Sequence, residues 1–250
     1  MARGPHPRLD EAMAWLEGHA TAHTRAGLTR YGIVTADRVL GVSMADTKRL
    51  GALLGRDHAL ADALWRTGVF DARMLVAFVA APAALTAAQM DRWCRQTDNW
   101  AYCDTLSFHL FDRTPHAWAK VDAWSRHHGE FVKRTAFALL WSLALHDKGR
   151  DEAPFRRGLQ LIEREAGDAR HFVMKAVNMA LRAVGRRGPR LHAGAVAVAR
   201  RLAAQDAAAP RWVGKDALET LLKTPPTKPH TAPRQSQPKV APEARSKTRN

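Results

Sequence analysis

Apolar residues recur at helical spacing through most of the first 223 residues, and the alternating pattern of half-buried strands is almost absent. Between residues 171 and 187 the apolar positions Val173, Val177, Ala180, Leu181 and Val184 form one face of a helix. The pattern therefore predicts an all-α protein.

Capping signals divide this pattern into short helices. Ser43 precedes Asp46 by three residues and Thr86 precedes Gln89 by three, which is the spacing of a capping box. Thr114, followed by a proline, suits another helix start. We predict helices at 9–25, 44–55, 57–67, 70–80, 87–97, 99–112, 115–127, 130–146, 152–166, 169–187, 189–204 and 210–223.

Short helices with tight connections must pack antiparallel to their neighbours. Stacked helix pairs of this kind form an α-solenoid, with a concave face suited to binding. A plain helical bundle fits the periodicity equally well. We expect one folded domain over residues 1–223.

The remaining residues, 224–250, have a different composition. They contain six Pro, six Lys or Arg, one Glu, and no Leu, Ile, Phe, Tyr or Trp. Such a segment buries too little apolar area to offset the entropy of ordering, so we predict a disordered basic tail.

Charge narrows the class of partner. The chain has 39 Lys and Arg against 24 Asp and Glu, a formal net charge of +15, of which the tail carries +5 and residues 1–223 carry +10. This excess favours a polyanionic partner, either nucleic acid or an anionic membrane surface.

There is no signal-peptide-like start and no apolar run of membrane-spanning length. Cys94 and Cys103 match no zinc or redox spacing, so we expect buried thiols in a cytoplasmic protein.

Two helix faces carry candidate chemistry, and the first lies in residues 171–187. Lys175, Met179, Arg182 and Arg186 form a stripe separate from the apolar face. Met179 could cover the edge of the core beneath long side chains. Alternatively, it could offer apolar surface to a ligand whose phosphates the cations hold.

The second face begins at the stretch DNWAYCD, residues 98–104. If Asp98 caps the helix, Trp100 and Asp104 lie one turn apart on the same side. An ion pair with a nearby Arg is the ordinary fate of such an Asp, and core packing is the ordinary fate of such a Trp. A functional role needs further support.

DNWAYCD resembles the signature of the bacterial DNA alkylation-repair glycosylases built from HEAT-like repeats, the AlkD-like family. The resemblance covers most of residues 30–222 and includes GVSMADTKRLG, LADALWRTGVFDARML, FVKRTAFALL, FVMKAVNMALR and RWVGKDAL.

The resemblance implies a DNA glycosylase of base-excision repair that removes cationic N3- or N7-alkylated purines from duplex DNA. It implies no cofactor, no base-sized pocket, and a monomer associated with the nucleoid. Asp104 would stabilise the sugar cation and orient water, and Trp100 would add cation–π attraction. Arg134 matches the family position that approaches DNA near the lesion. Weaker candidates for phosphate contact are Lys133, Lys175, Arg182 and Lys215.

One position departs from the family pattern. Met179 stands where the family usually has a second Trp, and Met lacks the ring quadrupole. The sequence therefore leaves open a non-catalytic binder of damaged or branched DNA, and a helical-repeat scaffold for an acidic protein. His19 and His23 lie four residues apart without a third ligand, so we expect no metal site.

Overall fold

The computed structural model describes residues 6–226, and the predicted tail from residue 227 onward lies outside the described part. Within residues 6–226 the chain forms thirteen α-helices, two short 3-10 turns and one isolated bridge between Arg38 and Val69. The α-helices are α1 Leu9–Gly18, α2 Ala22–Arg30, α3 Met44–Leu54, α4 His58–Arg66, α5 Phe70–Val79, α6 Ala87–Arg95, α7 Trp100–His109, α8 Ala117–Ser125, α9 Glu130–His146, α10 Glu152–Glu165, α11 His171–Gly185, α12 Pro189–Ala203 and α13 Ala208–Lys223; the 3-10 turns are η1 Pro82–Ala84 and η2 Phe111–Arg113.

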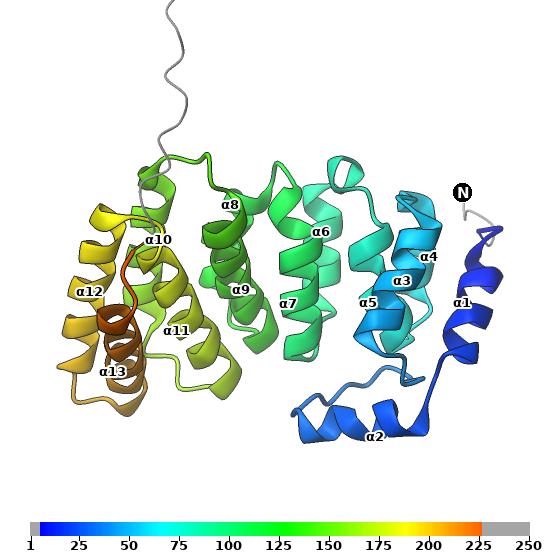
Figure 1. Ribbon diagram of the computed structural model, residues 1–250, viewed down its shortest axis with the longest axis horizontal. Helices are drawn as coiled ribbons and strands as arrows, with labels where there is room; N and C mark the ends of the chain where they lie inside the picture. Colours follow the sequence, from blue (N-terminus) through cyan, green and yellow to red (C-terminus); the bar gives the residue numbers. More distant parts are fainter. Residues whose placement is uncertain (1–5, 227–250) are drawn as a thin grey trace, which may run out of the picture.

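The helices stack in series, which confirms the α-solenoid over the plain bundle. Consecutive helices α4 and α5, α8 and α9, α10 and α11, and α12 and α13 pack as pairs. The helices α3, α5, α7, α9, α11 and α13 also pack on one another in that order and form one row. Figure 1 shows the whole stack running from α1 at one end to α12 and α13 at the other.

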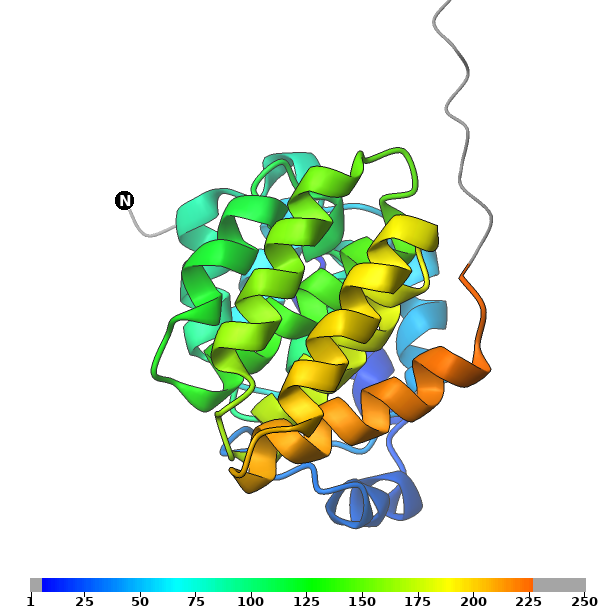
Figure 2. The ribbon, with the colours of Figure 1, turned by 90° about the vertical axis from the view of Figure 1, so that its left-hand side faces the viewer.

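The core fills the space between the two rows of helices. The large side chains of Trp93, Tyr102, Phe111, Phe137 and Phe155 are fully buried. At the end nearer the C-terminus, α10 and α12 run side by side, as Figure 2 shows. Every α-helix except α2, which has no buried residue, contributes an apolar face to the core, as the hydrophobic pattern predicts.

Two capping predictions are confirmed. The Ser43 hydroxyl accepts from the Asp46 amide at 3.1 Å to start α3, and the Thr86 hydroxyl accepts from the Gln89 amide at 3.1 Å to start α6. These contacts satisfy amide groups that have no partner inside the helix.

The predicted helix at 9–25 is wrong, because the structure has two helices there. α1 ends at Gly18, and the His19 ring stacks on Trp15 with 3.5 Å between ring centroids. Thr21 then caps α2 by accepting from the Thr24 amide. In Figure 1, α2 lies crosswise below the ends of α3 and α5 rather than joining the stack.

The connection between α2 and α3 depends on one glycine. Gly41 has a φ of 99°, and its carbonyl accepts from the Thr21 amide at 2.9 Å. A Cβ at this position would lie 2.5 Å from the Thr21 carbonyl oxygen, so a larger residue would push α2 away.

The region after α7 also differs from the prediction. α7 ends at His109 instead of reaching residue 112, and η2 follows. Thr114 does not cap α8: its hydroxyl donates to the Phe111 carbonyl at 2.8 Å and closes η2, and α8 begins only at Ala117. A local bond therefore takes the hydroxyl that was expected at the cap.

Candidate nucleic-acid interface

The stretch 98–104 begins α7, but the capping residue is Asn99. The Asn99 side-chain oxygen accepts from the Tyr102 amide at 3.1 Å. Asp98, which the sequence suggested as the cap, instead accepts from the Thr35 hydroxyl at 2.9 Å and the Ala36 amide at 2.7 Å. It therefore ties the segment after α2 to the start of α7.

Trp100 occupies the first turn of α7 and is half-buried. Its indole N–H donates to the Tyr31 carbonyl at 2.9 Å, and its ring packs beside a small apolar cluster that includes Ile33 and Phe70. The ring is therefore fixed from one side by the segment that follows α2.

Asp104 lies one turn later and is paired with Arg134 of α9. Nη2 of Arg134 donates to both carboxylate oxygens, at 2.9 and 2.8 Å. The Asp104 side chain is 21% exposed and the Arg134 side chain 6%. Burial raises the pKa of the Asp104 carboxyl above its ordinary value, while the Arg134 charge and hydrogen bonds act to lower it. The structure thus contains the ion pair with an Arg that the sequence analysis gave as one alternative for Asp104.

Arg134 links three helices. Its Nη1 donates to the Phe172 carbonyl in α11 at 2.8 Å, and its guanidinium carbon lies 6.0 Å from the Trp100 ring centre and 5.9 Å from that of Phe172. Its Nε is buried and has no hydrogen-bond partner within the described residues. Arg134 thus faces α7 and α11, and it positions Asp104 in this structure.

These contacts bring together the first two turns of α7, α9 and α11. Trp100, Asp104, Arg134 and Phe172 all lie there, so the three helices point their N-terminal ends toward one edge of the molecule. Helix N-termini carry a partial positive charge and suit anionic ligands. We call these four residues the α7–α9–α11 cluster.

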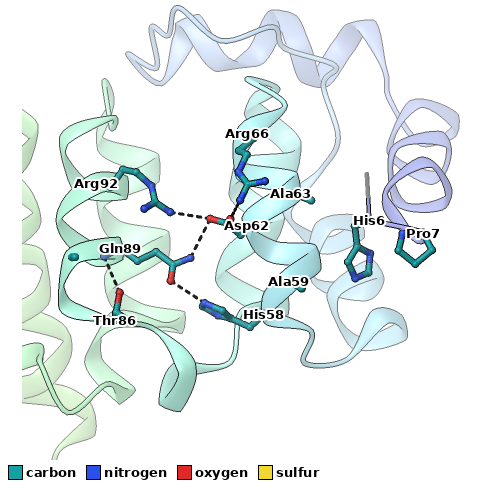
Figure 3. Close-up of a pocket in the computed structure, with 11 residues that line it drawn as sticks. His6, Pro7, His58, Ala59, Asp62, Ala63, Arg66, Thr86, Gln89 and Arg92 are labelled. Atoms are coloured by element: carbon teal, nitrogen blue, oxygen red, sulfur yellow. Dashed lines mark hydrogen bonds and ion pairs between the residues drawn. The ribbon is translucent and has the colours of Figure 1, made fainter. Parts of the chain in front are cut away.

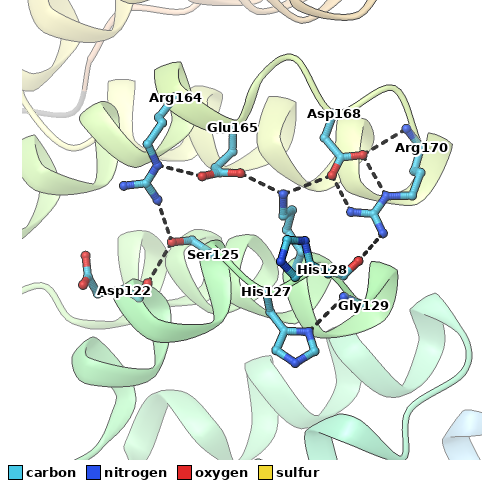
Figure 4. Close-up of polar contacts among 10 residues, drawn as sticks. Asp122, Ser125, His127, His128, Gly129, Arg164, Glu165, Asp168 and Arg170 are labelled. Carbon is cyan, nitrogen blue, oxygen red and sulfur yellow. Dashed lines mark hydrogen bonds and ion pairs between the residues drawn. The ribbon is translucent and has the colours of Figure 1, made fainter.

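Lys133, another cation expected to contact phosphate, is held in ion pairs within the protein. Lys133 is 12% exposed and lies between Glu165 at 2.8 Å and Asp168 at 3.2 Å. Asp168 is also bound by Arg170, whose hydrogen bonds lower the pKa of that carboxyl to about 2. Figure 4 shows this chain of charges beside His127 and His128. It fixes the loops that precede α9 and α11.

Three predicted residues remain accessible toward the end of the stack. Lys175 lies over the Trp212 ring, 4.5 Å from its centre. Arg182 approaches Asp216 at 3.6 Å, and Lys215 is exposed. Met179 is half-buried on α11, between the positions of Lys175 and Arg182.

Sequence reasoning missed the residues that hold the segment 37–42 against α5 and α7. Asp37 accepts from the Tyr102 hydroxyl at 2.6 Å and from Arg73 at 2.7 Å. Asp71 is 2% exposed and accepts from the amides of residues 40, 41 and 42, at 2.8, 3.3 and 2.7 Å. The available signal was an Asp at the start of a helix whose other residues are apolar except for Arg73, in FDARML.

A separate hollow of about 610 Å³ lies between α4 and α6. In Figure 3, Asp62 accepts from Arg66, Arg92 and Gln89, and His58 bonds Gln89. The residues that line the hollow include none of the α7–α9–α11 cluster. Its arginines are already paired with Asp62, so it does not extend the candidate interface.

Two further observations bear on the predicted character of the chain. Cys94 and Cys103 are buried free thiols as predicted, and burial raises the pKa of Cys103 to about 12. Across residues 6–226, every helix is too short or too polar to cross a bilayer, and no group of three or more His, Cys, Asp or Glu is placed to hold a metal ion.

Comparison with known proteins gives a family and a fold. No curated protein matches the chain. A solved structure, described as a new family of proteins related to the HEAT-like repeat DNA glycosylases with affinity for branched DNA structures, is similar with a TM-score of 0.71. It is 20% identical, and the match covers 86% of this chain and 92% of that one. The family described as DNA alkylation repair enzyme matches residues 12–221. Because the match spans most of the sequence, the chain belongs to the DNA alkylation repair enzyme family.

Proposed function

We propose that the protein is a DNA glycosylase that hydrolyses the N-glycosidic bond of cationic N3- or N7-alkylated purines in duplex DNA. Family membership supports a role in alkylation repair. The observation that carries the reaction is Asp104, a carboxylate that is held rigidly, remains partly exposed, and lies one turn from a half-buried Trp.

The chemistry needs little beyond a fixed negative charge. A purine alkylated at N3 or N7 is cationic, so the electron pair of the breaking bond neutralises it and no general acid is required. The deoxyribose becomes an oxocarbenium ion, which a carboxylate stabilises. Water then attacks C1′, its proton passes to Asp104 or to solvent, and an abasic site remains.

Asp104 keeps free hydrogen-bond acceptor positions while it is paired with Arg134. A carboxylate offers about four lone-pair positions, and Nη2 takes one on each oxygen. The second lone pair of each oxygen stays available for a sugar cation or a water molecule. Arg134 weakens the net field of the carboxylate, but it fixes its orientation, which lowers the cost of reorganisation in the transition state.

The DNA backbone would lie across the N-terminal ends of α7, α9 and α11. Lys175, Arg182 and Lys215 would hold phosphates farther along the stack. Lys133 and Arg134 have structural partners, so the proposal gives them positioning roles in place of phosphate contact.

The test is release of 7-methylguanine or 3-methyladenine from methylated duplex DNA under single-turnover conditions. Asp104→Asn keeps the size of the side chain and removes its charge, and we expect the rate to fall about 100-fold. Asp122→Asn, a half-exposed carboxylate on α8, is the matched control. Equal rates for Asp104→Asn and the parent would remove Asp104 from the reaction.

A second candidate function is binding of damaged or branched DNA without catalysis. Met179 favours it, because by resemblance the family places a Trp at this position. The similar structure described as having affinity for branched DNA also favours it. Met179→Trp distinguishes the two functions. Release of base only in this variant would indicate a DNA-binding protein that lost catalysis when Met replaced the family Trp.

A further inference from the structure

The segment that joins α2 to the bridge at Arg38 presents two apolar side chains to solvent. Tyr31 is 68% exposed and Val34 is 71% exposed, whereas Ile33 between them is buried. Exposed single apolar residues are common, but here two of them flank a buried anchor at the tip of one segment.

This tip is held firmly against the α7–α9–α11 cluster. The Tyr31 carbonyl accepts from the Trp100 indole, and Asp98 binds Thr35 and Ala36. Gly32 has a φ of 67°, and a Cβ there would lie 3.9 Å from the Phe172 ring. The tip therefore projects from a fixed base beside Trp100.

Two cations lie on the helix that leads into the tip, and the Asp98 carboxylate at the base of the tip is already bound to Thr35 and Ala36. Arg25 and Arg30 of α2 are exposed, and neither side chain has an ion-pair partner among residues 6–226. An apolar tip with cations beside it matches the chemistry of DNA, where base surfaces lie between phosphates. A membrane surface fits less well, because two side chains bury too little apolar area for stable anchoring.

We propose that Tyr31 and Val34 form a wedge that enters the base stack of DNA where the stack is already broken at a branch, while Arg25 and Arg30 hold the flanking phosphates. An intact stack must be separated before a side chain can enter, whereas a branch point needs no such separation. The wedge therefore selects branched over linear duplex. The inference rests on the proposed DNA binding, but it does not require base release.

The experiment places 2-aminopurine beside the branch point of a three-way junction and, separately, in a linear duplex of the same arm sequence. Its fluorescence rises when stacking is lost. The double variant Tyr31→Ser with Val34→Ser removes the wedge. Leu53→Ser is the matched control, because Leu53 is 68% exposed at the end of α3 remote from α2. Thermal melting followed by circular dichroism checks that each variant folds.

The parent should raise the fluorescence of the junction and bind it about tenfold more tightly than the linear duplex. The double variant should lose both effects and keep its affinity for linear duplex, and Leu53→Ser should behave as the parent. An unchanged fluorescence rise in the folded double variant overturns the wedge, as does a parent that raises no fluorescence. Loss of binding to phosphatidylserine vesicles, with junction binding retained, would assign the tip to membranes and also overturn it. Absence of base release with the wedge results as expected would refute only the glycosylase.

Discussion

The ion pair between Asp104 and Arg134 places a charged group of each sign in a largely enclosed site. A buried pair gains little over apolar packing, but removing one partner leaves an uncompensated charge. Retaining this pair beside two aromatic rings therefore suits a carboxylate whose direction matters. Arg134 also carries a buried Nε without a partner, so the site keeps one unsatisfied donor to hold that geometry.

The pH dependence of base release tests the charge of Asp104. Burial raises the pKa of this carboxyl above its ordinary 3.8, and Arg134 opposes the rise. Because the proposed reaction needs the ionised carboxylate, the single-turnover rate should fall with acid at a pH above 3.8. Arg134→Gln removes the opposing charge and should move this acid limb to higher pH. A limb that stays in place, in a variant that remains folded at each pH, would show that another group controls the rate.

Asp168 gives a prediction about stability. Its pKa is lowered to about 2 by Arg170, so its contribution to the free energy of unfolding is present above pH 3.8 and is lost as the pH falls toward 2. Asp168→Asn should lower that free energy by about 1 kcal/mol at pH 7, after allowance for solvent screening. The difference from the parent should narrow between pH 4 and about 2 in urea unfolding. Glu219→Gln, in an exposed pair with Lys223, is the control and should change little. A difference that is independent of pH would contradict this account.

At the scale of elements, two neighbouring residues at the start of α7 have different roles, whereas the sequence analysis gave only Asp98 a role, as the cap. Asn99 caps the helix, and Asp98 binds the segment after α2. Losing a side-chain cap costs about 1 kcal/mol. Asn99→Ala should therefore lower the free energy of unfolding by about that amount, and so should Ser43→Ala, which removes the cap of α3.

Asp98→Ala should act differently, because it leaves the cap in place and releases residues 35 and 36. We expect faster amide hydrogen exchange in the segment 31–36 and little change in the exchange of α7. Fast exchange along α7 in this variant would mean that Asp98 stabilises the helix itself.

Periodicity predicts elements well where packing and capping agree. The caps of α3 and α6 and the core face of α11 follow from residue spacing because each depends on neighbours within one helix. The division between α1 and α2 was missed, because the turn after α1 is held by the hydrogen bond from the Thr21 amide to the Gly41 carbonyl, a contact between residues far apart in the sequence. The α7–α9–α11 cluster could not be predicted in full for the same reason, because it depends on contacts between residues far apart in the sequence. The sequence places Trp100 and Asp104 one turn apart, but only the fold shows that Arg134 and Phe172 approach them.

At the scale of the whole molecule, both the helical stack and the tail carry a net positive charge, and the charge per residue is higher in the tail. Residues 224–250 carry a net charge of +5 of the chain's +15. Binding to duplex DNA releases counterions, so log K should fall linearly with log salt, with a slope of about −0.9 for each phosphate neutralised. Deleting residues 224–250 should make this slope shallower and weaken binding at low salt.

The same deletion should leave the single-turnover rate at saturating enzyme unchanged, because the tail lies outside the α7–α9–α11 cluster in the sequence. Lys175→Ala and Lys215→Ala provide the comparison within the stack: each should reduce the slope by about one phosphate, and the effects of the tail and the stack should add. A slope that is insensitive to the deletion but falls with the lysine variants would place all the phosphate contacts on the helices. Long-range charge would then guide DNA to the protein without help from the tail.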